Sequence, residues 1–275
     1  MSSWRRRIHD ASGVTEYPVG PMLGRLGRVE LGPVLVTTPG FDDIGQVLKK
    51  MGVEFTKFKG SFEAGLVFIN CGTSDTIDRK GLARFVAGGG CAYASDLTAS
   101  MIVQAFPGRF RQASGGSSGL VKTVVKDAEL AQIIGPEISI TFDMGGWTRL
   151  EAADGQTLLE GAAGTQCAGW PLMIEVGIGE GAVFYTSFHN RAQASKQEHD
   201  LLQLLVLKQL GSKTHQSVAA VGRSLGIDLV KMRPDGGGKK SPSGGSGSGD
   251  GPASGSGPAS GSGPASGSAS SGGQG

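Results

Sequence analysis

The sequence predicts an α/β domain built on an open, mainly parallel sheet. Short apolar strands alternate with helices between residues 33 and 94, and this alternation is typical of parallel strands joined by right-handed crossovers. One of these strands, Leu66 to Asn70, is apolar throughout, as in strands that are buried on both faces. Ligands of such sheets bind beyond the carboxyl ends of the strands, so we expect a functional site at that edge.

The first half of the domain follows this alternation closely. Each helix has acidic residues at its start that can act as N-caps, Asp42 or Asp43 in one helix and Asp75 or Asp78 in the other. The second helix stops at three consecutive glycines, which favour a helix end. The expected elements are a strand at 33–38, a helix at 44–51, strands at 53–58 and 66–70, a helix that ends at 88–90 and a strand at 91–94.

The second half has a different pattern, with more strands that we expect to be antiparallel or at an edge. A glycine-rich segment at 177–181 predicts a hairpin between two of them. A long helix from Gln193 or Ser195 to Leu210 carries leucines that face the sheet. The other expected elements are strands at 121–126, 138–142, 156–159, 172–176 and 182–187, a helix at 127–134, and a final helix and strand at 218–229.

Composition divides the chain into four parts. Residues 1–30 are interrupted by Pro and Gly and predict an irregular N-terminal arm, 31–212 form the main domain, and 213–233 are an extension of it. Residues 234–275 contain many of the 48 glycines and repeat GPASGS. Such a segment has no apolar surface to offset its ordering entropy. We therefore predict a disordered, natural low-complexity tail that acts as a tether or a spacer.

Charge and cysteine content exclude several classes of protein. The net charge is +2, and the only dense basic run is Arg5 to Arg7, which we interpret as a solvated terminus that could touch an acidic partner or membrane surface. We therefore expect no nucleic acid. The three cysteines lack CxxC spacing and the four histidines are scattered, so we expect no disulfide framework, no metal and no cofactor. No apolar run approaches the ~20 residues of a membrane span, and we expect a cytoplasmic protein without an integral membrane segment.

The stretch GGGCAYASDLTAS, from Gly88 to Ser100, has the outline of a strand that turns sharply into a helix. Such an elbow can present a nucleophile at the carboxyl edge of a sheet. Cys91 lies too early, within the strand, and the turn position falls on Ala94 or Ser95. Ser95 and Asp96 have a second interpretation, as N-caps of the helix that follows.

The order of these elements, together with the segment WPLMIEVGIGEGAVFYTSFHN, resembles the class I glutamine amidotransferase-like superfamily, and within it the ThuA-like (trehalose-utilisation) group. The residues that carry this resemblance are Trp170, Pro171, Gly179, Gly181, Val183, Phe184, Tyr185, Thr186, Ser187 and His189. The resemblance covers residues 31–210 and implies a flavodoxin-like three-layer sandwich. It also implies a crevice formed by the elbow and by the loop that holds the histidine.

Amidotransferases of this class carry a cysteine at the elbow, which a histidine and an orienting glutamate activate. This chain has no elbow cysteine, so the resemblance implies a site that has lost amidotransferase catalysis. The first hypothesis is a module that binds a small polar ligand or a protein partner. The alternative is a hydrolase or amide-acting enzyme in which Ser95 is the nucleophile, His189 the base and Glu198 the orienting carboxylate.

Five residues are predicted to line the crevice in either case. They follow expected strands, precede the long helix or lie on the variable DMGGW loop, where substrate and partner contacts are common. For the Asn70 segment we also weigh a purely structural turn, and for His189 and Asn190 a cap before the long helix. The predicted ligand-binding residues are Asn70, Gly72, Asp96, Trp147 and Asn190.

Overall fold

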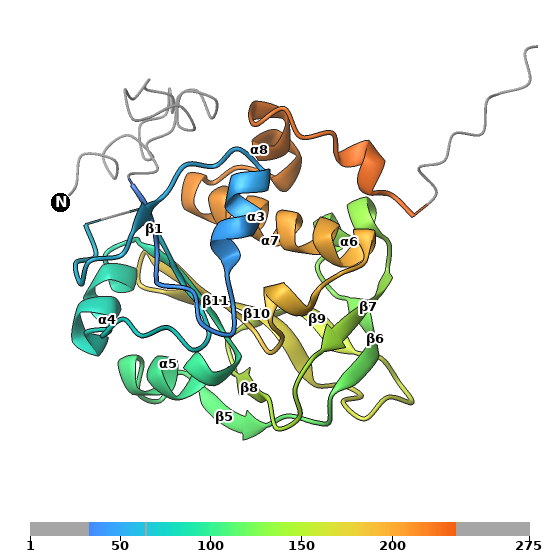
Figure 1. The fold of residues 1–275 in the computed structure, drawn as a ribbon, viewed down its shortest axis with the longest axis horizontal. Coiled ribbons are helices and arrows are strands. Elements are labelled where there is room, and N and C mark those ends of the chain that lie inside the picture. The colour runs from blue at the N-terminus through green and yellow to red at the C-terminus, as the bar shows by residue number, and fades with distance from the viewer. Residues whose placement is uncertain (1–32, 64, 235–275) are drawn as a thin grey trace, which may run out of the picture. The chain divides into compact units, whose positions relative to one another are not determined.

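The computed structural model describes residues 33–63 and 65–234, and the predicted N-terminal arm, 1–30, and residues 235–275 of the predicted tail lie outside them (Figure 1). The described residues form an α/β fold with a nine-stranded sheet and a separate two-stranded one. The strands are β1 (Val34–Val36), β2 (Thr56–Lys57), β3 (Leu66–Ile69), β4 (Cys91–Ser95), β5 (Arg111–Ser114), β6 (Gly119–Val125), β7 (Glu137–Phe142), β8 (Thr148–Glu151), β9 (Gln156–Gly161), β10 (Pro171–Ile178) and β11 (Gly181–Thr186). The helices are α3 (Ile44–Lys50), α4 (Arg79–Ala87), α5 (Ala99–Ala105), α6 (Ala128–Ile134), α7 (Lys196–Thr214) and α8 (Val218–Ser224), with short 3-10 helices at Asp96–Thr98, Asn190–Ala192 and Leu229–Met232.

The large sheet is mixed rather than mainly parallel. Its strand order is β2-β1-β3-β4-β11-β10-β9-β6-β7. The strands from β2 to β11 are parallel to their neighbours, whereas those from β11 to β7 are antiparallel. The antiparallel half agrees with the hairpin predicted at 177–181, because the two-residue turn between β10 and β11 can join only antiparallel strands. The functionally important edge is therefore the carboxyl end of β3, β4 and β11.

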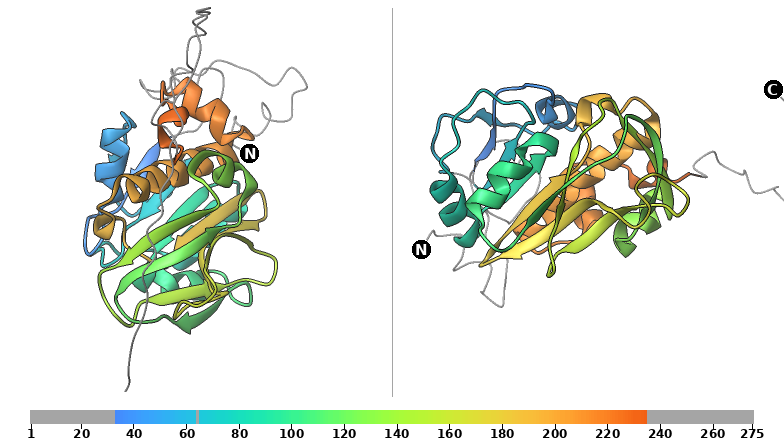
Figure 2. Two further views of the ribbon diagram at one scale, coloured as in Figure 1. Left: turned by 90° about the vertical axis from the view of Figure 1, so that its right-hand side faces the viewer. Right: turned by 90° about the horizontal axis from the view of Figure 1, so that it is seen from below.

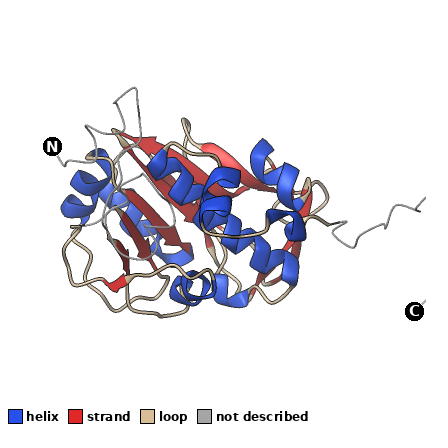
Figure 3. Ribbon diagram, turned by 90° about the horizontal axis from the view of Figure 1, so that it is seen from above, coloured by secondary structure: helices blue, strands red, loops and turns tan. Residues whose placement is uncertain are grey.

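Both faces of the sheet are covered by packed apolar side chains, in two core clusters. Residues of β4 alternate between them: Cys91 and Tyr93 belong to one cluster, and Ala92 and Ala94 to the other, as the two-residue period of a strand requires. Helices α3, α6, α7 and α8 contribute to the first cluster, and α4 and α5 to the second. Figures 2 and 3 show these helices against the strands.

The long helix begins at Lys196, one residue after Ser195 and three after Gln193, the two predicted starts, and extends four residues further than predicted. Ser195 caps it, with its side chain accepting from the backbone N–H of Glu198 while the Glu198 side chain accepts from the backbone N–H of Ser195. This reciprocal pairing is a capping box. The predicted final strand near residue 229 is instead a 3-10 helix, Leu229–Met232, and the Met232 side chain packs into the first core cluster.

Two further elements differ from the prediction. The strand expected at 53–58 is reduced to Thr56–Lys57 at the edge of the sheet. The segments Arg111–Ser114 and Thr148–Glu151 pair as a small antiparallel sheet that the surrounding Gly and Ser residues concealed. No helix of residues 33–63 and 65–234 is both long enough and apolar enough to cross a membrane.

Candidate functional site

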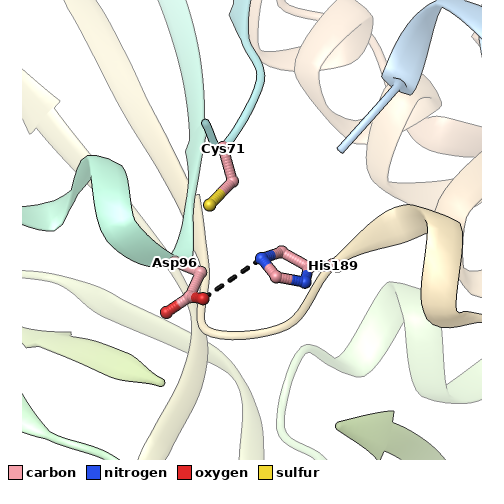
Figure 4. Close-up of side chains that lie close together, drawn as sticks. All are labelled: Cys71, Asp96 and His189. Atoms are coloured by element: carbon pink, nitrogen blue, oxygen red, sulfur yellow. Dashed lines mark ion pairs between the residues drawn. The ribbon is translucent and has the colours of Figure 1, made fainter. Parts of the chain in front are cut away.

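Three neighbouring strands of the parallel half each deliver one reactive side chain to the same place. Cys71 follows β3, Asp96 follows β4 and His189 follows β11, and these three strands are adjacent and parallel. All three residues are buried, with exposed fractions of 0%, 1% and 2%. Figure 4 shows their side chains pointing toward one another. We call these residues the strand-end cluster.

His189 is held between two carboxylates. Its Nδ1 lies 2.9 Å from Oδ1 of Asp143, and its Nε2 lies 3.1 Å from Oδ2 of Asp96. A carboxylate can only accept a hydrogen bond, so Nδ1 carries a proton and donates it to Asp143. Nε2 is close enough to Asp96 for an ion pair, but the geometry is not that of a hydrogen bond. Nε2 makes no hydrogen bond to any of the described residues.

The surroundings of His189 favour its protonated form. Burial alone lowers the pKa of the imidazole, but the side chains of Asp96 and Cys71 and the negative charge of Asp42 outweigh it and raise the pKa to about 11. A general base with that pKa holds its proton at neutral pH. In this arrangement His189 is a cation that pairs with Asp96, and it is not poised to accept a proton from a nucleophile.

The elbow residue is Asp96, and neither Ala94 nor Ser95, which are the last residues of β4. Asp96 has φ of 39°, a left-handed conformation that costs free energy for a residue other than glycine. Thr148 stabilises it: its backbone N–H donates to Oδ1 of Asp96 over 2.7 Å, and its hydroxyl donates to the Asp96 carbonyl over 2.6 Å. The Tyr185 hydroxyl also donates to that carbonyl, over 2.8 Å.

Ser95 makes no hydrogen bond to His189 and is not a side-chain cap. Its hydroxyl is fully buried and donates to Oδ2 of Asp42 over 2.6 Å. It makes no capping hydrogen bond to the helix that follows. The ring nitrogens of His189 face Asp96 and Asp143, so the structure does not assemble the predicted Ser95–His189 pair.

Asp42 joins three segments beneath the site. While one of its oxygens accepts from Ser95, Oδ1 accepts from the backbone N–H groups of Asn190 and Arg191, over 2.6 and 3.3 Å. Burial raises the pKa of Asp42 to about 6, although the hydrogen bond from Ser95 and the positive charge of His189 work in the opposite direction. Asp42 or Asp43 was predicted as the helix cap; Asp43 occupies the N-cap position of α3, whereas the Asp42 carboxylate fixes the loops around the cluster.

Glu198 does not orient His189. Its Oε1 accepts from the backbone N–H and the hydroxyl of Thr141, over 2.9 and 2.6 Å, and its Oε2 accepts from the backbone N–H of Ser195 over 2.8 Å. These contacts complete the capping box of α7 and fasten that helix to β7. The orienting carboxylate belongs to Asp143, in the loop after β7.

Two of the predicted ligand-binding residues have structural roles. Asn70 is fully buried, and its Oδ1 accepts from the backbone N–H of Ile44 while its Nδ2 donates to the Thr37 carbonyl, both over 2.9 Å. Trp147 is 2% exposed and stacks on Phe142 with ring centroids 4.2 Å apart. The DMGGW loop therefore turns its tryptophan into the core and presents Asp143 to the site.

Gly72 and Asn190 lie beside the strand-end cluster. Gly72 has φ of 71°, and a Cβ there would lie 2.6 Å from the Phe41 ring, so only glycine allows that ring its place. Phe41 is 52% exposed and stacks over His189 with centroids 6.2 Å apart. The Asn190 Oδ1 accepts from the backbone N–H of Asp43 over 3.1 Å, while its Nδ2 makes no hydrogen bond within the described residues.

The strand-end cluster also has the composition of a metal site. One ligand atom from each of Cys71, Asp96 and His189 lies within 4.8 Å of the others. The prediction that the chain has no metal site depended on sequence spacing. The fold, however, brings together residues that are 25 or more positions apart in the chain.

Comparisons with known proteins concern the fold. No protein-family model and no curated protein sequence matches the chain. Solved structures that match include a glutamine amidotransferase from Thermotoga maritima (11% identity, 74% of this chain and 98% of that chain, TM-score 0.41). They also include a protein described as ThuA-like from Parabacteroides merdae (11% identity, 67% of this chain and 90% of that chain, TM-score 0.47).

An exo-β-1,4-mannosidase from an Opitutaceae bacterium also matches, with 14% identity over 71% of this chain and a TM-score of 0.41. The chain spans only 36% of the length of that enzyme, and 34% of a β-galactosidase from Bacillus circulans.

Replacing Asp42 by Asn tests the electrostatics beneath the site. Because the pKa of Asp42 is about 6 in the fold against 3.8 in the unfolded chain, the fold prefers the protonated acid. The stabilisation that the protonated Asp42 gives the fold is complete below pH 3.8 and is lost as the pH rises through 6. The loss in the free energy of unfolding is about 3 kcal/mol in all. We expect D42N, which cannot ionise, to escape this loss. In urea unfolding, the stability of D42N relative to the wild type should therefore be higher at pH 7 than at pH 4. Parallel pH curves for the two proteins would contradict the assignment.

Proposed function

We propose that this chain is a glutamine amidotransferase-like domain that has lost amidotransferase catalysis and serves as a binding module for a small polar ligand or a protein partner. The elbow supports the first half of this proposal. The turn after β4, where the resemblance to amidotransferases implies a cysteine, holds a carboxylate, Asp96, and both of its oxygens are engaged, one by Thr148 and one by His189.

Neither of the two candidate nucleophiles in the GGGCAYASDLTAS stretch, Ser95 and Cys91, is available. Ser95 donates its hydroxyl to Asp42. Cys91 lies at the beginning of β4, is 2% exposed, and burial raises the pKa of its thiol to about 11. Since the thiolate is the reactive form of cysteine, Cys91 is a packing residue.

The observation that carries the binding proposal is a concentration of unpartnered polar atoms beside the site. Among the described residues, five buried side-chain nitrogen and oxygen atoms lack a hydrogen bond, and three of them belong to Ser187, His189 and Asn190. Each such atom costs about 1–3 kcal/mol unless a partner is found. A polar ligand at the end of β11 would supply partners for the Ser187 hydroxyl and the Asn190 amide.

Exposed apolar side chains flank the same place. Phe41 stacks over His189, and Leu97, which follows Asp96, is 45% exposed. Binding sites commonly combine a few fixed polar groups with an apolar rim. The proposed occupant is therefore polar at the end that meets the cluster and has an apolar face toward Phe41 and Leu97.

The proposal also includes the three-layer arrangement of the domain, the role of the tail and the cellular compartment that were expected from the sequence. Helices on both faces of the sheet support a flavodoxin-like three-layer arrangement for the main domain, residues 31–212. The Gly/Ser/Pro/Ala-rich composition of 234–275 supports a tethering role. The described cysteines are all free thiols, which supports a reducing compartment such as the cytoplasm.

The alternative, catalysis in the same crevice, has one observation in its favour. Cys71 rather than Ser95 lies beside His189, and Asp143 holds the far side of the imidazole. This arrangement has the components of a thiol–imidazole–carboxylate triad. The raised pKa of His189 and the complete burial of Cys71 favour binding over catalysis.

Incubation with L-glutamine tests the loss of catalysis. We expect the full chain to release no ammonia above the rate of a buffer blank, because no elbow nucleophile is available. S95A and C71S should give the same result. Ammonia release that S95A abolishes would restore the Ser95 alternative, and release that C71S abolishes would establish the Cys71 triad.

A thermal-shift screen of small polar metabolites tests the binding half. We expect a ligand that raises the melting temperature of the wild type to have a smaller effect on F41A, because Phe41 forms the rim above His189. Leu120, another exposed apolar residue (69% exposed) on β6, provides the matched control, and L120A should respond as the wild type does. A ligand that stabilises F41A and the wild type equally would place binding elsewhere.

A further inference from the structure

We propose that Cys71, Asp96 and His189 form a zinc site at the carboxyl ends of β3, β4 and β11. The ligand atoms are Sγ of Cys71, Oδ2 of Asp96 and Nε2 of His189 (Figure 4). The inference goes beyond the proposed function and does not require it, because Zn²⁺ binding can be measured without any organic ligand.

The separations within the strand-end cluster suit a small metal ion. Zinc bonds of about 2.0–2.3 Å at tetrahedral angles place ligand atoms about 3.3–3.6 Å apart. Nε2 of His189 and Oδ2 of Asp96 are 3.1 Å apart, and all three ligand atoms lie within 4.8 Å of one another. Adjustments of about 1 Å in side-chain position therefore suffice to surround one ion, without any change in the strands.

An independent observation points to a ligand of His189. The residue is 2% exposed and its Nε2 faces the cluster, yet this atom makes no hydrogen bond within the described residues. A simple ion pair with Asp96 would be stronger if the N–H were directed at the carboxylate oxygen. A metal ion between Nε2, Oδ2 and Sγ would give this nitrogen a partner.

The neighbours of the cluster match the outer shell of a metal site. Histidine ligands usually donate their other ring nitrogen to a carboxylate, which fixes the tautomer, and His189 Nδ1 donates to Asp143 over 2.9 Å. Ligating carboxylates are themselves held by hydrogen bonds, and Oδ1 of Asp96 accepts from the backbone N–H of Thr148 over 2.7 Å. The positive φ of Asp96 then presents the second oxygen to His189.

The donor set selects zinc among common biological metals. A thiolate and an imidazole favour zinc over magnesium and calcium, which prefer oxygen alone. On binding, Cys71 loses its thiol proton and Nε2 of His189 gives up its proton, both to solvent. Three protein ligands leave a fourth position for water or for a donor atom of a bound molecule, as in open zinc sites.

Metal titration of the full chain tests this proposal. After treatment with a chelator, the protein is titrated with Zn²⁺ against a chromogenic chelator, and Co²⁺ is added separately as a spectroscopic probe. We expect one Zn²⁺ per chain, and a Co²⁺ complex with a thiolate-to-metal charge-transfer band and intense tetrahedral d–d bands. C71A and H189A should weaken Zn²⁺ binding by at least about 100-fold, and D143N by about 10–100-fold.

The chain supplies matched controls. Cys167 is a buried cysteine and His199 a histidine outside the cluster, so C167A and H199A should bind Zn²⁺ as the wild type does. A zinc content near zero at saturating Zn²⁺, equal affinities for C71A and C167A, or a Co²⁺ complex without the charge-transfer band would each overturn the site. The Co²⁺ spectrum is measured on the wild type, so it decides the question even where a variant fails to fold. Ammonia release from glutamine, by contrast, would overturn the proposed function alone.

Discussion

The position of the His189 imidazole between Asp96 and Asp143 is the interaction on which the rest of the site depends. It joins three segments that are distant in sequence: the end of β4, the end of β11 and the loop after β7. A buried imidazolium is stable only with paired charges, and Asp96 provides the buried partner. The same pairing explains how Asp96 maintains a left-handed backbone, because its carbonyl and both of its carboxylate oxygens have partners that compensate for the strain.

Asp42 forms a second layer that keeps this arrangement in place. Its carboxylate is fully buried and connects the loop after β1 to Ser95 and to the backbone of Asn190. Ser95, the nucleophile of the alternative hypothesis, therefore acts as a structural hydrogen-bond donor. At the turn after β4 the Ser95 hydroxyl and the Asp96 carboxylate are both engaged by other side chains and backbone groups, which supports the proposed loss of an elbow nucleophile.

The elements that depend on local pattern could be predicted from the sequence, and the chemistry of the site could not. The apolar run 66–70, the hairpin at 177–181 and the long helix from Ser195 carry signals within a few residues, and each is present. The elbow was misplaced because a strand's end shifts by a residue without changing its apolar pattern, and only the positive φ of Asp96 locates the turn. Cys71 stood at a strand end, which was a usable signal, but its approach to His189 depends on sheet order.

Asp143 illustrates the remaining difficulty. Nothing in DMGGW distinguishes a carboxylate that orients a histidine 46 positions away, because that contact exists only after β7 and β11 have taken their places in the sheet. Glu198, nearer to His189 in sequence, was the obvious choice, yet the start of a helix is where a glutamate is most readily satisfied by backbone N–H groups. Proximity along the chain was therefore a poor guide to the orienting residue.

The tautomer of His189 tests the central claim most directly. A long-range ¹H–¹⁵N correlation spectrum of the histidine-labelled protein, assigned with H189Q, reports which ring nitrogen carries a proton. The account predicts a protonated Nδ1, with or without added Zn²⁺, because Asp143 accepts from that atom in both states. An imidazole that carries its only proton on Nε2 would contradict the account, since neither the contact with Asp143 nor a metal bond at Nε2 could then exist.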